Sequence, residues 1–307
     1  MIPQLLLTSA VIAAVARYAV RRRAERAVDR RLPVGADGII PGAHGIAIDP
    51  PGATIGVLLL HGFGDTPQSL HYLADDLAAH GYLVRAPLLP GHGRTLRAFA
   101  RSRAGEWLGA ARSARDALQG RCERVAIVGQ SMGGALAVML AAERPPGALV
   151  LLAPYLAASP GVARLARWGE LASLFAPYVG SRSGGLSIQD FDERSRALGY
   201  GITTPRLLAE LSAMAVRASA ALGEIRTPTL VVQSRDDHRV APAVAEQAVR
   251  RLAAREKRLE WVEGCGHVLT ADRERGRVFA AIREWLARHL PPAGAPGDAS
   301  ADGAATR

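Results

Sequence analysis

Lysine is almost absent from this sequence, since only Lys257 among its 38 basic residues is a lysine. So uniform a preference for arginine is typical of a base-composition bias in the coding sequence rather than of selected phosphate binding. Aromatic residues are also scarce, at 5%, whereas a nucleic-acid interface needs a basic stripe with interleaved aromatics. We therefore expect no nucleic-acid partner.

Cysteine is nearly as rare. Cys122 and Cys265 are the only two, which excludes a disulfide framework, and their spacing does not match a metal site. Cys265 stands two residues before His267, but a small buried hydrophobic role is the expected one. We expect no metal and no cofactor.

The length of 307 residues, with 49% hydrophobic and 21% charged residues, fits one soluble globular domain between two distinct ends. We place this domain at residues 32–290. The last segment, 291–307, is rich in Pro, Ala, Gly and Asp without apolar periodicity, and we expect a disordered tail there.

The first segment, residues 1–31, is apolar up to Ala16 and then rich in arginine. It carries seven arginines and two acidic residues, which is half of the net charge of +10. A helix over residues 2–20 would be about 28 Å long, close to the ~30 Å of a hydrocarbon core. We expect a retained membrane anchor or interfacial helix with the domain on the cytoplasmic side. A cleaved export signal and a plain terminal helix of a soluble cytoplasmic protein stay open.

Short aliphatic runs alternate with helical patterns along the domain, which is typical of an α/β fold with a mostly parallel sheet flanked by helices. In such sheets functional residues gather at the carboxyl ends of the strands. Helices are expected at about 96–119, 131–143, 242–254 and 272–290. Strands are expected at 54–60, 82–86, 124–129, 148–153, 228–233 and 258–263.

About 70 residues separate two of these strands, too many for an ordinary connection. We predict that residues 155–225 form a helical cap or lid, with Trp168, Phe175 and Met214 available to line an apolar pocket.

The run "RVAIVGQSMGGALAVML" reads as a strand, a tight turn and a helix, with Ser131 in the turn. Gly129 and Gly133 remove the side chains that would collide in so sharp a bend, so the serine projects from the sheet edge. This arrangement predicts a nucleophile elbow.

A nucleophilic serine needs a base, and the base needs an acid that orients it. The acid follows a strand in "LVVQSRDDHRVAP", where the spacing from Gln233 favours Asp237 over Asp236. The base follows the last strand in "GCGH", where His267 fits and His238 does not.

An oxyanion hole completes such a site, with two backbone N–H groups directed at the developing charge. The loop "HGFGDTP" after the first strong strand predicts Phe63 as one donor, and Met132, which follows the nucleophile, as the other. His61 and His92 are expected to shape their loops rather than to act as acid or base.

The motifs "HGFGDTP", "PGHG", "GQSMGG", "QSRDDHRV" and "GCGHVLTAD" occur in this order within residues 46–290. Together they resemble the α/β-hydrolase superfamily, in its bacterial carboxylesterase and monoacylglycerol lipase branch. The resemblance implies a serine hydrolase of small esters or monoacylglycerols, with a helical cap and no cofactor. An acyltransferase or carbon–carbon bond hydrolase with the same triad, and a non-catalytic ligand-binding relative, are the alternatives. Acyl-chain length and oligomeric state stay open.

Overall fold

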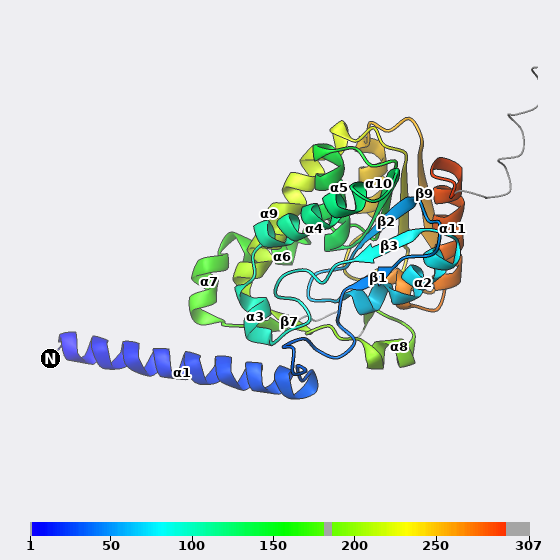
Figure 1. Ribbon diagram of the computed structural model, residues 1–307. Helices are drawn as coiled ribbons and strands as arrows, with labels where there is room; N and C mark the ends of the chain where they lie inside the picture. The colour runs from blue at the N-terminus through cyan, green and yellow to red at the C-terminus, as the bar shows by residue number, and fades with distance from the viewer. Residues whose placement is uncertain (1, 181–185, 293–307) are drawn as a thin grey trace, which may run out of the picture.

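The computed structural model describes residues 2–180 and 186–292, and its centre is a seven-stranded sheet in the order β1-β3-β2-β4-β5-β8-β9 (Figure 1). β1 pairs antiparallel with β3, and the other neighbours pair in parallel. The predicted mostly parallel sheet is thus confirmed. The strands are Ile46–Ile48 (β1), Ile55–Leu60 (β2), Leu83–Ala86 (β3), Arg124–Gln130 (β4), Ala148–Leu152 (β5), Thr229–Ser234 (β8) and Lys257–Val262 (β9).

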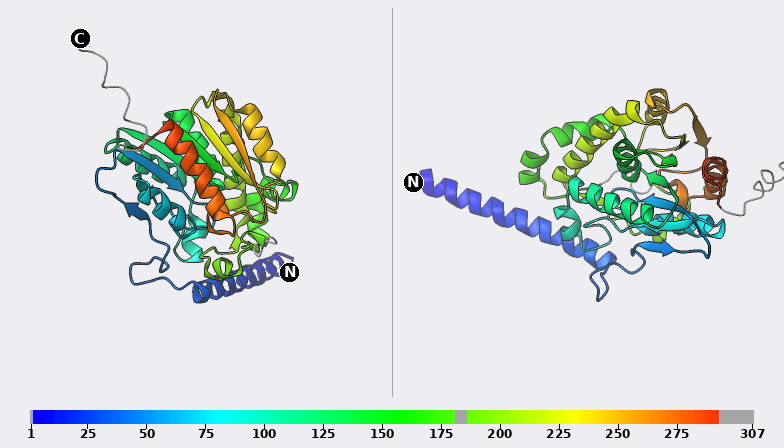
Figure 2. Two further views of the ribbon diagram at one scale, coloured as in Figure 1. Left: turned by 90° about the vertical axis from the view of Figure 1, so that its right-hand side faces the viewer. Right: turned by 45° about the horizontal axis from the view of Figure 1, so that its top comes forward.

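Helices cover both faces of the sheet (Figures 1 and 2), because the central strands are apolar on both sides. In β2, the side chains of Leu58 and Leu60 enter one core cluster, whereas Leu59 enters the other. The first cluster includes side chains of α4, α5, α9 and α10, and the second those of α2 and α11. These helices span His71–Ala79 (α2), Ala104–Gln119 (α4), Met132–Glu143 (α5), Pro205–Ala221 (α9), Pro242–Arg251 (α10) and Arg275–His289 (α11).

The helix expected at 96–119 is two helices, α3 (Leu96–Arg101) and α4. The chain is extended at Ser102, with φ −63° and ψ 163°. Ser102 packs so closely on Gly91 that a Cβ atom added to Gly91 would lie 2.6 Å from the Ser102 Cβ. A new helix then starts, since the Glu106 carboxylate accepts the Arg103 N–H at 2.8 Å. Such local packing is invisible in the apolar periodicity.

The chain between β5 and β8 forms the predicted helical insertion. Besides α9 it holds α6 (Pro160–Arg167), α7 (Gly169–Phe175), α8 (Phe191–Arg196) and the short antiparallel pair β6 (Val179–Gly180) and β7 (Ile202–Thr203). Residues 181–185 of this insertion lie outside the described residues.

The predicted lining of this insertion was wrong for its aromatic residues. The side chains of Trp168 and Phe175 are 58% and 83% exposed, so they lie on the surface. Met214 is buried, because α9 places Leu207, Leu211 and Met214 on one face at helical spacing and packs that face against the body.

The N-terminal segment is one long helix, α1 (Ile2–Arg31), which projects from the body as a rod (Figure 1). Its last turns are attached: Val28 is buried, and the Glu25 carboxylate accepts a hydrogen bond from the Tyr178 hydroxyl at 3.1 Å. Within the described residues, no helix combines the length and hydropathy needed to cross a bilayer. Of the tail expected at 291–307, residues 293–307 lie outside the described residues.

Candidate active site

Ser131 lies in the turn between β4 and α5. Its φ of 56° and ψ of −115° are rare for a residue with a side chain, and such strain costs on the order of 1–3 kcal/mol. The two neighbouring glycines permit the turn: a Cβ atom on Gly133 would lie 2.0 Å from the Leu60 carbonyl oxygen, and one on Gly129 2.2 Å from the Gly133 oxygen. This is the strand–turn–helix geometry of a nucleophile elbow.

His267 and Asp237 meet Ser131 at the carboxyl ends of the strands. The His267 Nε2 lies 2.7 Å from the Ser131 Oγ, and its Nδ1 lies 2.8 Å from the Asp237 Oδ2. Because a carboxylate accepts hydrogen bonds, we assign the ring proton to Nδ1, which leaves Nε2 able to accept the serine proton. The three side chains are therefore connected as a Ser-His-Asp relay.

The Asp237 carboxylate is fixed by its own loop and strand. Oδ1 accepts the N–H groups of Arg239 and Val240 at 2.7 and 3.0 Å, and Oδ2 also accepts Gln233 Nε2 at 2.9 Å. Burial alone would raise the pKa of Asp237, but the hydrogen bond and charge of His267, with the two backbone N–H groups, outweigh it and lower the pKa. The acid therefore stays ionised beside the imidazole.

The neighbouring candidates do not join this relay. Asp236 accepts the backbone N–H of Gly264 at 2.8 Å, and His238 is exposed. His267 thus contacts Asp237, the acid that the sequence favoured.

The two predicted oxyanion donors lie on adjacent loops. Met132 is the first residue of α5, so its N–H has no acceptor within the helix. Phe63 follows Gly62, and a Cβ atom on Gly62 would lie 3.5 Å from the Ser131 Cβ. The loop after β2 therefore packs directly against Ser131.

His61 and His92 have structural contacts. The His61 Nε2 accepts the Leu89 N–H at 3.1 Å, and its Nδ1 lies 2.9 Å from the Gly62 oxygen. Burial lowers the pKa of His61 to about 4 and that of His92 well below its usual value. Both rings are therefore neutral at pH 7, and they hold the loops after β2 and β3.

Several known proteins are similar to this chain. The family model described as serine aminopeptidase, S33 (Hydrolase_4) matches residues 53–274. A thermostable monoacylglycerol lipase from Bacillus sp. (strain H-257) is 31% identical over 238 residues, which cover 76% of this chain and 91% of the lipase. The chain belongs to this family of α/β-hydrolases. It is a serine hydrolase of the esterase and lipase branch.

Two further relatives are also esterases or lipolytic enzymes. A carboxylesterase from Bacillus subtilis (strain 168) is 27% identical over 232 residues, which cover 75% of this chain and 91% of the esterase. A solved structure from a study of LipS and LipT, two metagenome-derived lipolytic enzymes, is 31% identical with a TM-score of 0.73. That match covers 82% of this chain and all of the other.

Sequence reasoning missed two carboxylates that follow Phe63 and His267 in the chain. Asp65 follows the Phe63 loop and accepts the Ser69 hydroxyl at 2.6 Å; burial raises its pKa, although the charges of His267 and Arg239 oppose the rise. Asp272 is fully buried five residues after His267. Asp65 lies in the motif "HGFGDTP" and Asp272 in "GCGHVLTAD". Their hydrogen-bond partners, however, become visible only in the three-dimensional structure.

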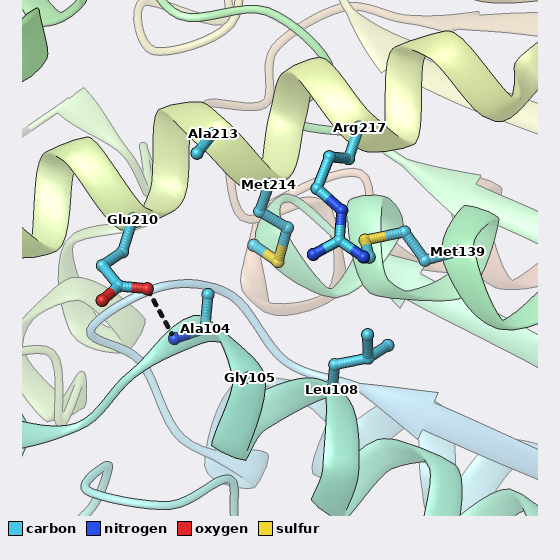
Figure 3. A pocket seen from close by; sticks show the side chains of 8 residues that line it. All are labelled: Ala104, Gly105, Leu108, Met139, Glu210, Ala213, Met214 and Arg217. Carbon is cyan, nitrogen blue, oxygen red and sulfur yellow. Dashed lines mark hydrogen bonds between the residues drawn. The ribbon is translucent and has the colours of Figure 1, made fainter.

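A separate pocket of about 130 Å³ lies between α4, α5 and α9 (Figure 3). Leu108, Met139 and Met214 supply apolar walls, and Glu210 and Arg217 line it from α9. None of the three relay residues lines this pocket.

Proposed function

We propose that this enzyme hydrolyses carboxylic esters through an acyl-enzyme on Ser131, with His267 as the base and Asp237 as the residue that orients it. The observation that supports this most is the continuous hydrogen-bond chain from the Ser131 Oγ through His267 to Asp237. A serine hydroxyl is a weak nucleophile until a neighbouring base accepts its proton, and this chain supplies that base.

In the first half-reaction, the His267 Nε2 takes the Ser131 proton while the Oγ attacks the ester carbonyl carbon. The carbon–oxygen double bond opens to an oxyanion, which the N–H groups of Phe63 and Met132 stabilise. When the carbonyl re-forms, the ester C–O bond breaks and the alcohol leaves with the proton from His267.

In the second half-reaction, His267 takes a proton from water and the resulting hydroxide attacks the acyl carbon. The same two N–H groups stabilise the second oxyanion, the bond to the Ser131 Oγ breaks, and the serine recovers its proton. Water is the only co-reactant, so the sequence of steps needs no metal or cofactor.

We propose monoacylglycerols and small esters as substrates, because the relatives described above are a monoacylglycerol lipase, a carboxylesterase and lipolytic enzymes. The alternatives use the same acyl-enzyme or the same relay: an acyltransferase delivers the acyl group to an alcohol, and a carbon–carbon bond hydrolase cleaves a different bond. Product analysis with glycerol added to the aqueous reaction separates them. Hydrolysis predicts free acid as the main product at every glycerol concentration below that of water.

The Ser131→Ala variant tests the proposal directly. It should bind but not hydrolyse p-nitrophenyl esters, while its circular dichroism and melting temperature stay close to those of the parent. A series of monoacylglycerols and p-nitrophenyl esters of increasing acyl length then identifies the preferred substrate. Undiminished turnover by a folded Ser131→Ala variant would refute the assigned nucleophile.

We also propose that α1 holds the enzyme at an anionic bilayer surface rather than within the bilayer. Val11, Ile12, Val15, Tyr18 and Val20 of α1 are each more than half exposed, and exposed arginines follow in the same helix. The Arg17 guanidinium donates to the Ser173 oxygen of α7 at 2.9 Å. α7 adds further exposed apolar side chains, namely Leu171, Leu174 and Phe175.

Apolar side chains that enter the headgroup region, followed by arginines that contact acidic lipids, are typical of interfacial helices. The full-length chain should sediment with phosphatidylcholine vesicles that contain phosphatidylglycerol, and the double variant Ile12→Asp with Val15→Asp should remain in the supernatant. Val216→Asp changes an exposed apolar residue on α9 and should bind like the parent. Absence of the parent from the vesicle pellet at low salt, or equal loss in the control, would contradict the proposal.

A further inference from the structure

Asp272 joins two parts of the chain that the sequence keeps far apart. Its side chain is fully buried. Oδ2 accepts the backbone N–H of Gly266 at 2.6 Å and that of Gln189 at 2.9 Å, and Oδ1 accepts those of Asp190 and Arg273, both at 2.9 Å. One carboxylate therefore bonds the loop that carries His267 and the part of the helical insertion that precedes α8.

These two segments also touch directly on both sides of His267. A Cβ atom on Gly266 would lie 2.6 Å from the carbonyl oxygens of Leu186 and Ser187. On the other side, the Val268 N–H donates to the Ser187 oxygen at 2.9 Å. The residue before the histidine is thus held by Asp272, and the residue after it by the insertion.

Capping of the last helix does not explain the position of Asp272. α11 begins at Arg275, and its N-cap position is Glu274, whose side chain makes no capping bond. Only the bond to the Arg273 N–H stays local. The other three side-chain bonds run to the histidine loop and the insertion, so they hold these segments together rather than start the helix.

We propose that Asp272 is a positioning residue for His267 and that it couples the histidine to residues 186–190 of the insertion. The inference rests on the proposed function, in which the Nε2 must stay within hydrogen-bonding reach of the Ser131 Oγ. Since buried N–H groups need acceptors, removal of the carboxylate frees the Gly266 and Gln189 amides to seek other partners. The histidine loop then shifts with them.

Two substitutions of graded severity test the role. Asp272→Asn keeps one oxygen acceptor but turns an NH₂ group toward two of the four N–H groups, and Asp272→Ala removes all four acceptors. Asp190→Ala is the matched control in the same segment. The Asp190 carboxylate caps α8 by accepting the Asp192 and Glu193 N–H groups at 3.0 and 3.1 Å. Asp190→Ala should therefore lower the stability of the protein without a change beside His267.

We expect kcat for p-nitrophenyl acetate to fall by about 10- to 100-fold in Asp272→Asn, because a displacement near 1 Å of a reacting group costs about that much. The KM of this small substrate should stay within about two-fold, since the acyl site is unchanged. Asp272→Ala should lose more activity, and Asp190→Ala should keep kcat within about two-fold of the parent.

Proton NMR gives a readout that is independent of turnover. The downfield resonance of the His267 Nδ1–H bonded to Asp237, assigned by its absence in His267→Ala, should broaden or move in Asp272→Asn and stay in place in Asp190→Ala. An unchanged resonance and unchanged kcat in the folded Asp272 variants would overturn the inference, as would an equal loss of kcat in Asp190→Ala. Turnover that persists in Ser131→Ala, with a changed resonance in Asp272→Asn, would refute the proposed function and leave only the positional coupling between Asp272 and His267.

Discussion

A single methyl group at Gly133 should disable the site. The added Cβ would lie 2.0 Å from the Leu60 oxygen, whereas carbon and oxygen that are not bonded stay more than 3 Å apart. Since Leu60 ends β2 and lies in register with Gly129 of β4, neither strand can yield without moving its neighbours. Relief of the clash therefore requires the elbow to move by about 1 Å relative to the loop that carries Phe63, and such a displacement costs about 100-fold in rate.

Gly133→Ala should also lose stability by about 1–3 kcal/mol, the usual cost of overpacking. Gly109→Ala is the matched control: it lies inside α4, and a Cβ atom there meets no other atom within 4 Å. This control should gain about 0.5–1 kcal/mol, the helical preference for alanine over glycine. Urea unfolding and steady-state hydrolysis of p-nitrophenyl acetate measure both effects. Full activity in Gly133→Ala would refute the packing described for the elbow.

Further predictions concern the acid and the pH dependence of stability. Asp237→Asn should lower kcat by about 10³- to 10⁴-fold. The asparagine oxygen would still accept the Arg239 and Val240 N–H groups, so its NH₂ group would face His267. Because that NH₂ group donates to Nδ1, the imidazole would be held in the wrong tautomer. Asp236→Asn, measured in the same esterase assay, should stay within about ten-fold of the parent, since the Asp236 carboxylate accepts the Gly264 N–H and not a bond from His267; a larger loss than in Asp237→Asn would reverse the assignment. The free energy of unfolding should fall as the pH drops from about 6.5 to about 4, by up to about 3 kcal/mol from His61 alone, because the unfolded chain binds a proton that the buried ring, with its pKa of about 4, does not. Urea titrations at several pH values, compared with His61→Gln, should show a flatter dependence in the variant, and identical slopes would contradict the burial of a neutral ring.

Much of the fold and the relay could be predicted from the sequence because their signals are local. Runs such as "VAIVG", rich in β-branched residues, favour a strand, and the glycines around Ser131 are explained by the closeness of the neighbouring backbone. Asp237 could be separated from Asp236 by its spacing from Gln233, whose amide indeed bonds the Asp237 carboxylate at 2.9 Å. In these cases the residues that determine a feature are close to it in the chain.

The features that were missed depend on distant contacts. The sequence does not show what, if anything, packs on an apolar side chain of a helix. Trp168 and Phe175 were therefore expected to line a pocket, but they lie on the surface. The break at Ser102 depends on Gly91, eleven residues earlier. The partners of Asp272 include Gln189 and Asp190, more than 80 residues away, and no spacing rule connects them.

Mass spectrometry of the enzyme treated with a fluorophosphonate shows whether Ser131 forms the covalent intermediate. We expect one adduct per chain, located on the peptide that contains Ser131, with a parallel loss of esterase activity and no adduct in Ser131→Ala. An adduct on another residue together with loss of activity, or unimpaired hydrolysis by a chain fully modified at Ser131, would contradict it.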